Sequence, residues 1–250
     1  MVELSLTRLA GTGTSGRLLL VGPSLGTSVA SLWRDCAGSL PGDVEVVGWD
    51  LPGHGAAAPA TGPFTVRDVA DAVAGRGAAL AEGRPVDYAG VSFGGAVGFD
   101  LATRADGPFG AVVCIAAAPR IGQPEMWRER AALVRRAGTP AVVEGAAHRW
   151  FAPGFADRSP GVAGELLAAL AEVDDESYAL ACEALAGFEA RAAVKPLWVL
   201  VGAHDVVVSP ENADLVLSRC GHLPPAEDPA GVAVAVRRVL EEMRCPTTTA

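Results

Sequence analysis

The sequence predicts an α/β protein with a mostly parallel central sheet, and two observations lead to this prediction. Short, almost unbroken apolar runs alternate along the chain with longer stretches that are rich in alanine and leucine. Strands that are apolar at nearly every position are typical of a parallel sheet that helices cover on both faces. Residues 124–193 depart from this alternation, because they contain helical stretches and no strand signal.

The expected strands are short apolar runs that end at a small or turn-forming residue. In chain order they are residues 4–9, 17–21, 44–49, 86–90, 111–115 and 197–201. The Gly/Thr/Ser-rich residues 11–16 predict a turn that joins the first two strands as a hairpin. Helices are expected at residues 28–39, 65–80, 94–104 and 229–243.

The interval without strands predicts an all-helical cap. Its helical stretches are interrupted by breaks at residues 138–140 and 152–160. An all-helical insertion between two strands of a sheet is expected to lie over the mouth of an active site. The predicted organisation is therefore a core of residues 1–123 and 194–250, with residues 124–193 inserted as the cap.

Composition restricts the partners that we expect. The 250 residues are 50% hydrophobic, and 20 Lys+Arg against 29 Asp+Glu give a net charge of −9. This acidic balance argues against nucleic acid or an anionic membrane as partner. No apolar run approaches the roughly 18 residues of a transmembrane helix, and Glu3 stands where a signal peptide would be basic. The cysteines form no C-x-x-C pair, which predicts buried thiols and a cytoplasmic location.

Two segments match G-x-S-x-G, the pattern in which a sharp turn between a strand and a helix exposes a serine nucleophile. They are residues 90–94, around Ser92, and residues 22–26, around Ser24. The pattern alone is suggestive, because 30 of the residues are glycine. We expect Ser92 to be the nucleophile, since several strands precede it and the small residues after it let the helix approach its strand. The structural alternative is a turn serine.

The segment around Ser24 is expected to form an oxyanion hole instead. It follows the expected strand 17–21, which should lie beside the strand that ends at Ser92. We therefore expect the backbone N–H groups of Leu25 and Phe93 to bind the oxygen of the reacting carbonyl. Pro23 has no N–H group to donate, which favours Leu25. For the Ser24 side chain, contact with the substrate and a simple turn role are equally open.

A serine nucleophile needs a histidine that accepts its proton and a carboxylate that orients the histidine. His222 is the only one of the four histidines that fits the order Ser…Asp…His fully. Asp205 follows the expected strand 197–201 and lies 17 residues before His222. The predicted triad is thus Ser92, His222 and Asp205, whereas His54 is expected to shape the mouth of the site. No metal site is expected, because the chain has no H-x-x-x-H pattern and no Cys/His cluster.

These residues resemble the α/β-hydrolase superfamily over nearly the whole chain, and the 3-oxoadipate enol-lactonases most closely. Residues 24–27 with Trp33 are similar to the oxyanion segment of that family, and residues 149–155 (RWFAPGF) are similar to its cap. The cap motif indicates the subfamily more specifically than the oxyanion segment does, because caps differ most between hydrolase subfamilies. Further similar stretches are residues 50–55, 119–122 with Trp127, and 221–225. The chain departs at Gly22-Pro23, where the family usually has Ser-Asn.

The resemblance implies an α/β-hydrolase fold and the hydrolysis of a small anionic enol-lactone to 3-oxoadipate, in aromatic catabolism and without a cofactor. It implies a substrate pocket in which Arg120 and Arg149 are candidates for binding the anion and Trp127 and Trp150 form apolar walls. The alternative for each arginine is an exposed charge, and for the tryptophans a place in the cap core. Some relatives carry a fused decarboxylase domain, which we do not expect after the helix at 229–243.

Two other functions fit the same residues. A broad-specificity carboxylesterase or a cofactor-free perhydrolase would use the same triad on a different substrate. A ligand receptor of this fold would bind a small molecule without hydrolysing it, since a fold does not fix a function. Turnover of enol-lactone against turnover of p-nitrophenyl acetate distinguishes the lactonase from the esterase.

Overall fold

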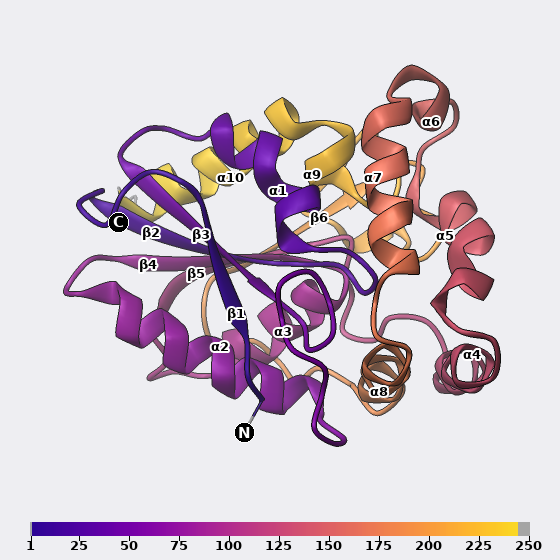
Figure 1. The fold of residues 1–250 in the computed structure, drawn as a ribbon. Coiled ribbons are helices and arrows are strands. Elements are labelled where there is room, and N and C mark those ends of the chain that lie inside the picture. Colours follow the sequence, from indigo (N-terminus) through magenta and orange to yellow (C-terminus); the bar gives the residue numbers. More distant parts are fainter. Residues whose placement is uncertain (1, 245–250) are drawn as a thin grey trace.

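A seven-stranded sheet forms the centre of the computed structural model, which describes residues 2–244 and their side chains as far as residue 242 (Figure 1). The strand order is β1-β3-β2-β4-β5-β6-β7, and every neighbouring pair is parallel except β1 with β3. The strands are β1 (Ser5–Ala10), β2 (Arg17–Gly22), β3 (Val44–Asp50), β4 (Val86–Val91), β5 (Phe109–Ile115), β6 (Leu197–Gly202) and β7 (Leu215–Leu217).

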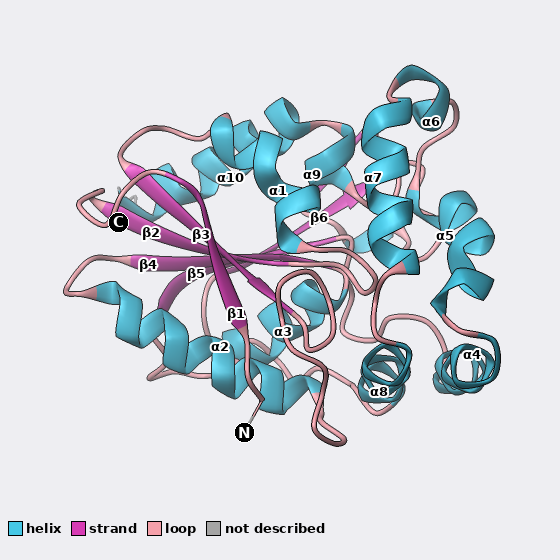
Figure 2. Cartoon of the chain, viewed as in Figure 1, coloured by secondary structure: helices cyan, strands magenta, loops and turns pink. Residues whose placement is uncertain are grey.

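Helices cover both faces of the sheet (Figure 2). One face carries α1 (Val29–Gly38), α9 (Pro224–Glu227) and α10 (Pro229–Arg244), and the other carries α2 (Val66–Ala81) and α3 (Phe93–Ala102). The strands β2, β3 and β4 are buried at every position, which is why they are apolar almost throughout. The predicted α/β fold, with a mostly parallel sheet and helices on both faces, is confirmed, and its strands and helices lie close to the expected positions.

The predicted hairpin between the first two strands is wrong. The strand β1 pairs antiparallel with β3, and Leu6 lies opposite Trp49. Both edges of β2 are occupied by parallel neighbours, so that Leu19 lies between Val46 of β3 and Asp87 of β4. The chain therefore crosses over β3 after the turn at residues 11–16. The strand β7 was also missed, because it is three residues long and mostly exposed.

The residues between β5 and β6 form helices and no strand. We call residues 124–193 the cap segment; its role as an inserted domain remains a prediction. These helices gather at one end of the sheet, on the right of Figure 1, where α4 packs against α8. They are α4 (Pro124–Ala137), the 3-10 turn η1 (Thr139–Val142), α5 (Val143–Trp150), α6 (Phe155–Arg158), α7 (Pro160–Ala171) and α8 (Asp175–Ala186).

Two further sequence expectations concern the described residues. Four of the cysteines are buried free thiols, and Cys245 lies outside the described residues. Within residues 2–244, no helix is long and apolar enough to cross a membrane.

Candidate active site

Ser92 lies on a strained turn between β4 and α3. Its backbone dihedral angles are φ 53° and ψ −106°, a combination that residues other than glycine rarely adopt. A Cβ atom on Gly90 would lie 2.2 Å from the carbonyl oxygen of Gly94, so only glycine fits there. That same carbonyl accepts a hydrogen bond of 2.8 Å from the Tyr88 hydroxyl. The G-x-S-x-G pattern thus has a steric basis at this position.

The structure brings Ser92, His222 and Asp205 together in a buried chain of hydrogen bonds. The Oγ atom of Ser92 lies 2.9 Å from Nε2 of His222, whose Nδ1 lies 2.8 Å from Oδ2 of Asp205. The other oxygen of Asp205 accepts the N–H groups of Val207 at 2.7 Å and Val208 at 3.0 Å. Because a carboxylate only accepts, the proton of a neutral His222 belongs on Nδ1, and Nε2 is left to accept the Ser92 proton.

The loop after β2 docks against the turn that carries Ser92. The carbonyl of Pro23 accepts the Gly94 N–H at 2.9 Å, and Ser24 and Leu25 line a cavity together with Ser92. Among the hydrogen bonds of the described residues, neither Leu25 N–H nor Phe93 N–H donates to another protein group. Both amides are therefore available beside the serine, as an oxyanion hole requires.

The glycine at position 22, where the family that the sequence resembles usually has a serine, has a steric explanation. A Cβ atom at this position would lie 2.5 Å from the Tyr88 hydroxyl and 2.7 Å from the Trp49 ring. The Gly22 carbonyl also accepts the indole N–H of Trp33 at 2.9 Å. The serine that is usual in the family has no room for its side chain here.

A cavity of about 290 Å³ lies between the triad and the cap segment. Four of the expected substrate residues line it, namely Ser24, Trp127, Arg149 and Trp150. Its lining otherwise combines apolar walls with a few polar groups: Leu25, Ser92, Gly122, Gln123, Met126, Arg130, Ala146, Tyr178, Val206, Val207 and His222. Such a cavity suits a small ligand with an apolar body and a polar or charged group.

Arg120, the fifth expected substrate residue, does not line this cavity, and that placement is corrected. It is exposed, and its Nη2 atom lies 2.6 Å from Oε2 of Glu189. The side chain is thus held by an acid on the surface. A different arginine, Arg130 of α4, occupies the cavity instead. Arg130 was missed, although its position three residues after Trp127 places both on one helix face.

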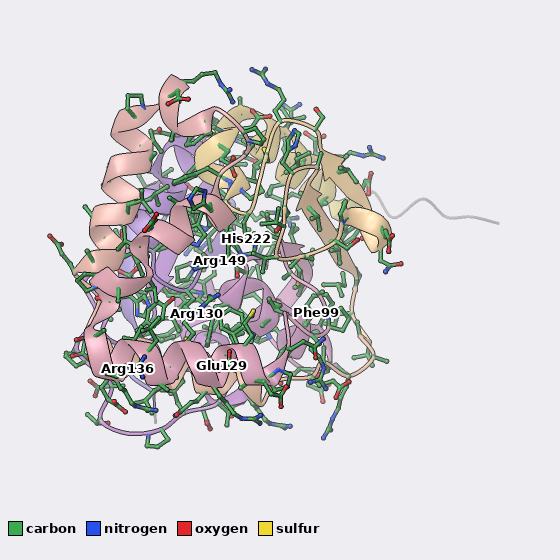
Figure 3. All side chains as sticks on the ribbon, turned by 90° about the vertical axis from the view of Figure 1, so that its right-hand side faces the viewer. Phe99, Glu129, Arg130, Arg136, Arg149 and His222 are labelled. Atoms are coloured by element: carbon green, nitrogen blue, oxygen red, sulfur yellow. The ribbon has the colours of Figure 1, made fainter. Side chains whose placement is uncertain are left out.

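Arg130 and Arg149 are two positive charges in the cavity without an acidic partner. No ion pair within the described side chains includes either of them. The Arg130 guanidinium lies 4.7 Å above the centre of the Trp127 ring. Burial, and next the charge of Arg130, lower the pKa of Arg149. In Figure 3 both arginines lie near His222 in the middle of the view.

His54 lies behind the cavity wall. It is fully buried, its Nδ1 lies 2.9 Å from the Pro52 carbonyl oxygen, and its ring stacks 6.3 Å from that of Tyr178, which lines the cavity. Burial lowers the pKa of His54 to about 4. The ring is therefore neutral at pH 7 and supports the wall of the site. Among the described residues, no group of three or more His, Cys, Asp or Glu side chains could hold a metal ion.

This buried histidine makes folding depend on pH. The unfolded chain binds a proton at His54 near pH 6.5, whereas the folded chain binds it only near pH 4. Between these values the unfolded state holds more protons, so stability rises with pH. The contribution is complete above about pH 6.5, and we expect the free energy of unfolding to lose about 3 kcal/mol from this group as the pH falls to about 4.

Urea unfolding of His54→Asn over this pH window measures the contribution. We expect a smaller loss of unfolding free energy in the variant than in the wild type. His148→Asn, at an exposed position on α5, is the control and should keep the wild-type slope. An unchanged slope in His54→Asn would assign the pH dependence to other groups.

Comparison with known proteins identifies the family of the chain. A sequence model described as "Alpha/beta hydrolase family" matches residues 18–236. The chain is 32% identical over 212 residues to 3-oxoadipate enol-lactonase 2 of Acinetobacter baylyi, which covers 82% of this chain and 76% of that protein. The crystal structure of the enol-lactonase from Burkholderia xenovorans superimposes with a TM-score of 0.88 at 26% identity, over 96% of this chain and 97% of that one. A hydrolase structure from Pseudomonas aeruginosa gives 0.84 at 26% identity, over 95% and 93%.

Proposed function

The chain belongs to the alpha/beta hydrolase family, in the branch that includes the 3-oxoadipate enol-lactonases, and from this premise we propose that it opens a small anionic enol-lactone to 3-oxoadipate. It is a hydrolase, and the proposal concerns its substrate and its catalytic residues. We also propose that the enzyme is cytoplasmic and acts in the catabolism of aromatic compounds. The observation that carries the proposal is the pair of arginines without acidic partners in the cavity at Ser92.

In the proposed reaction Ser92 transfers its proton to Nε2 of His222 as its Oγ atom attacks the lactone carbonyl. The N–H groups of Leu25 and Phe93 hold the oxyanion of the tetrahedral intermediate. The ring C–O bond then breaks, His222 returns the proton to the enolate oxygen, and an acyl-enzyme on Ser92 results. Water that gives a proton to His222 attacks this ester, and the proton returns to Ser92 as the acid leaves.

The paired arginines favour an anionic substrate over a neutral one. The protein carries a net charge of −9, so an anion needs a local region of positive charge to bind. Two like charges close to each other in a partly buried cavity repel, and a bound carboxylate relieves that repulsion. A guanidinium also fits a carboxylate with two parallel hydrogen bonds. Arg149 and Arg130 therefore suit the carboxylate of the lactone, with Trp127 and Trp150 against its ring.

Turnover of freshly generated enol-lactone, followed by ultraviolet absorbance, tests the proposal. We expect hydrolysis of the lactone with a kcat/KM well above that for p-nitrophenyl acetate, because the acetate ester has no carboxylate for the arginines. The apolar cavity walls also suit a neutral ester, which makes a broad carboxylesterase the second candidate. Turnover of the simple ester alone would support that candidate against the lactonase.

Substitution of the cavity arginines should separate anion binding from chemistry. Arg149→Ala and Arg130→Gln should each raise KM for the lactone by roughly 10- to 100-fold, which corresponds to the loss of a hydrogen bond to a charged group. KM for p-nitrophenyl acetate should change little. Arg128→Ala, an exposed position on the same helix α4, is the matched control. Equal effects of an arginine substitution on lactone and ester would make that arginine structural.

A further inference from the structure

The carboxylate of Glu227 joins two segments that meet at the candidate active site. Its Oε1 atom accepts the N–H groups of Gly221 at 2.9 Å and Leu223 at 3.1 Å, the two residues that flank His222. Its Oε2 atom accepts the N–H group of Ala152 at 2.7 Å, in the cap segment. One side chain on α9 thus binds both the loop of the histidine and the cap segment.

The same two segments also touch directly. The N–H group of His222 donates to the carbonyl of Trp150 at 2.8 Å. A Cβ atom on Gly221 would lie 2.7 Å from the backbone nitrogen of Ala152, so the backbones pack without space for a side chain. Just before Ala152, Arg149 and Trp150 line the cavity. The position of the cavity wall and the position of His222 are therefore linked.

We propose that Glu227 is a positioning residue for the hydrolysis: its carboxylate holds the loop of His222 and the part of the cap segment that follows Arg149 and Trp150 in one fixed arrangement. The inference rests on the proposed function, because it assigns Glu227 a role in the reaction of Ser92 and His222. Among the described residues, the hydrogen bonds of the Glu227 carboxylate go to backbone N–H groups on both sides and not to these two side chains.

Only a carboxylate can accept all the hydrogen bonds that are donated at this position. Three N–H donors point at Glu227, and a carboxylate has two oxygens that only accept. A glutamine has one oxygen, so its NH2 group must face either Ala152 or the loop of His222, donor against donor. Burial raises the pKa of Glu227, and the three amide hydrogen bonds with the charge of His222 oppose that rise. Glu227→Gln is therefore a near-isosteric way to break one side of the link.

The control is another carboxylate that joins the cap segment to the core. Glu165 on α7 lies 3.5 Å from Arg34 on α1, and both side chains are more than half exposed. Exposed ion pairs of this kind contribute little to the free energy of unfolding. Glu165→Gln thus removes the same charge from a cap-to-core contact that does not reach His222.

The test consists of three measurements, and the first two compare Glu227→Gln with Glu165→Gln. Reaction with a fluorophosphonate probe, in which the Ser92 oxygen displaces fluoride and gives its proton to His222, reports the serine–histidine alignment without a substrate carboxylate. We expect its rate constant to fall by roughly 10- to 100-fold in Glu227→Gln, since a displacement of about 1 Å has effects of this size. KM for the enol-lactone should rise more than KM for p-nitrophenyl acetate. Glu165→Gln should match the wild type in both.

The third measurement needs no substitution and therefore does not depend on the folding of a variant. In wild-type protein, hydrogen exchange at the amides of Ala152, Gly221 and Leu223 should be slow and similar, because one carboxylate holds all three. Fast exchange at Ala152 beside slow exchange at the other two would overturn the link. So would a probe rate in Glu227→Gln within twofold of that in Glu165→Gln.

The same measurements distinguish a failure of the proposed function from a failure of the proposed role of Glu227. A wild-type protein that neither reacts with the probe nor hydrolyses either substrate would overturn the hydrolysis by Ser92, and with it the role of Glu227. A reactive wild type without lactone turnover would remove only the lactone as substrate, and the probe rates would still decide on Glu227. A reactive wild type with a Glu227→Gln variant of equal rate would remove Glu227 alone.

Discussion

Replacement of Ser92 by alanine is expected to lower kcat for the enol-lactone by about 10⁴- to 10⁶-fold and to leave the fold intact. Ser92 is the only serine whose Oγ atom contacts a histidine in the described residues, at 2.9 Å from Nε2 of His222. Without this oxygen no acyl-enzyme forms, and only binding and the amide donors remain. Initial rates with the lactone, with circular dichroism as the check on folding, measure the effect.

Ser24→Ala is the matched control, because Ser24 belongs to the second G-x-S-x-G segment and lines the same cavity. Its side chain has no histidine partner among the described residues, so we expect most of the kcat to remain. Retention of activity in Ser92→Ala would remove Ser92 from the mechanism. A large loss of kcat in Ser24→Ala with little loss in Ser92→Ala would make Ser24 the nucleophile.

The sequence predicts best those features that local chemistry determines. The strands β2 to β6 follow from apolar runs, and the turn at Ser92 follows from glycines where a side chain would collide with the backbone. The pairing of β1 was not predictable in this way, because a short turn allows a hairpin and only the neighbours of β2 exclude it. Strand order is a property of the whole sheet.

The site residues also divide into those that the local sequence indicates and those that depend on contacts between distant segments. The order of strands and helices along the sequence singles out Ser92, Asp205 and His222, and the structure places their side chains in one chain of hydrogen bonds. Arg120 was expected in the substrate pocket, but Glu189 holds its side chain at the surface, and the sequence alone does not show this contact. Glu227 left no signal, because its partners are backbone amides in two segments, one of them 75 residues away.

Asp205→Asn exchanges a single oxygen for an NH2 group, and we expect it to lower kcat by about 10⁴-fold. The N–H groups of Val207 and Val208 point at Oδ1 of Asp205, so the asparagine must turn its oxygen toward them. Its NH2 group then faces Nδ1 of His222, which has to accept a hydrogen bond. The ring proton moves to Nε2, and Nε2 can no longer accept the proton of Ser92.

The loss should therefore appear in kcat, in the probe rate and in the turnover of both substrates alike, with KM for the lactone nearly unchanged. Asp214→Asn is the matched control, because Asp214 also accepts a backbone N–H, from Val199 at 2.7 Å, but is exposed and has no histidine partner among the described residues. It should keep the wild-type rate. Near-normal rates in Asp205→Asn would mean that the orientation of His222 does not depend on the carboxylate, and the triad would reduce to a serine and a histidine.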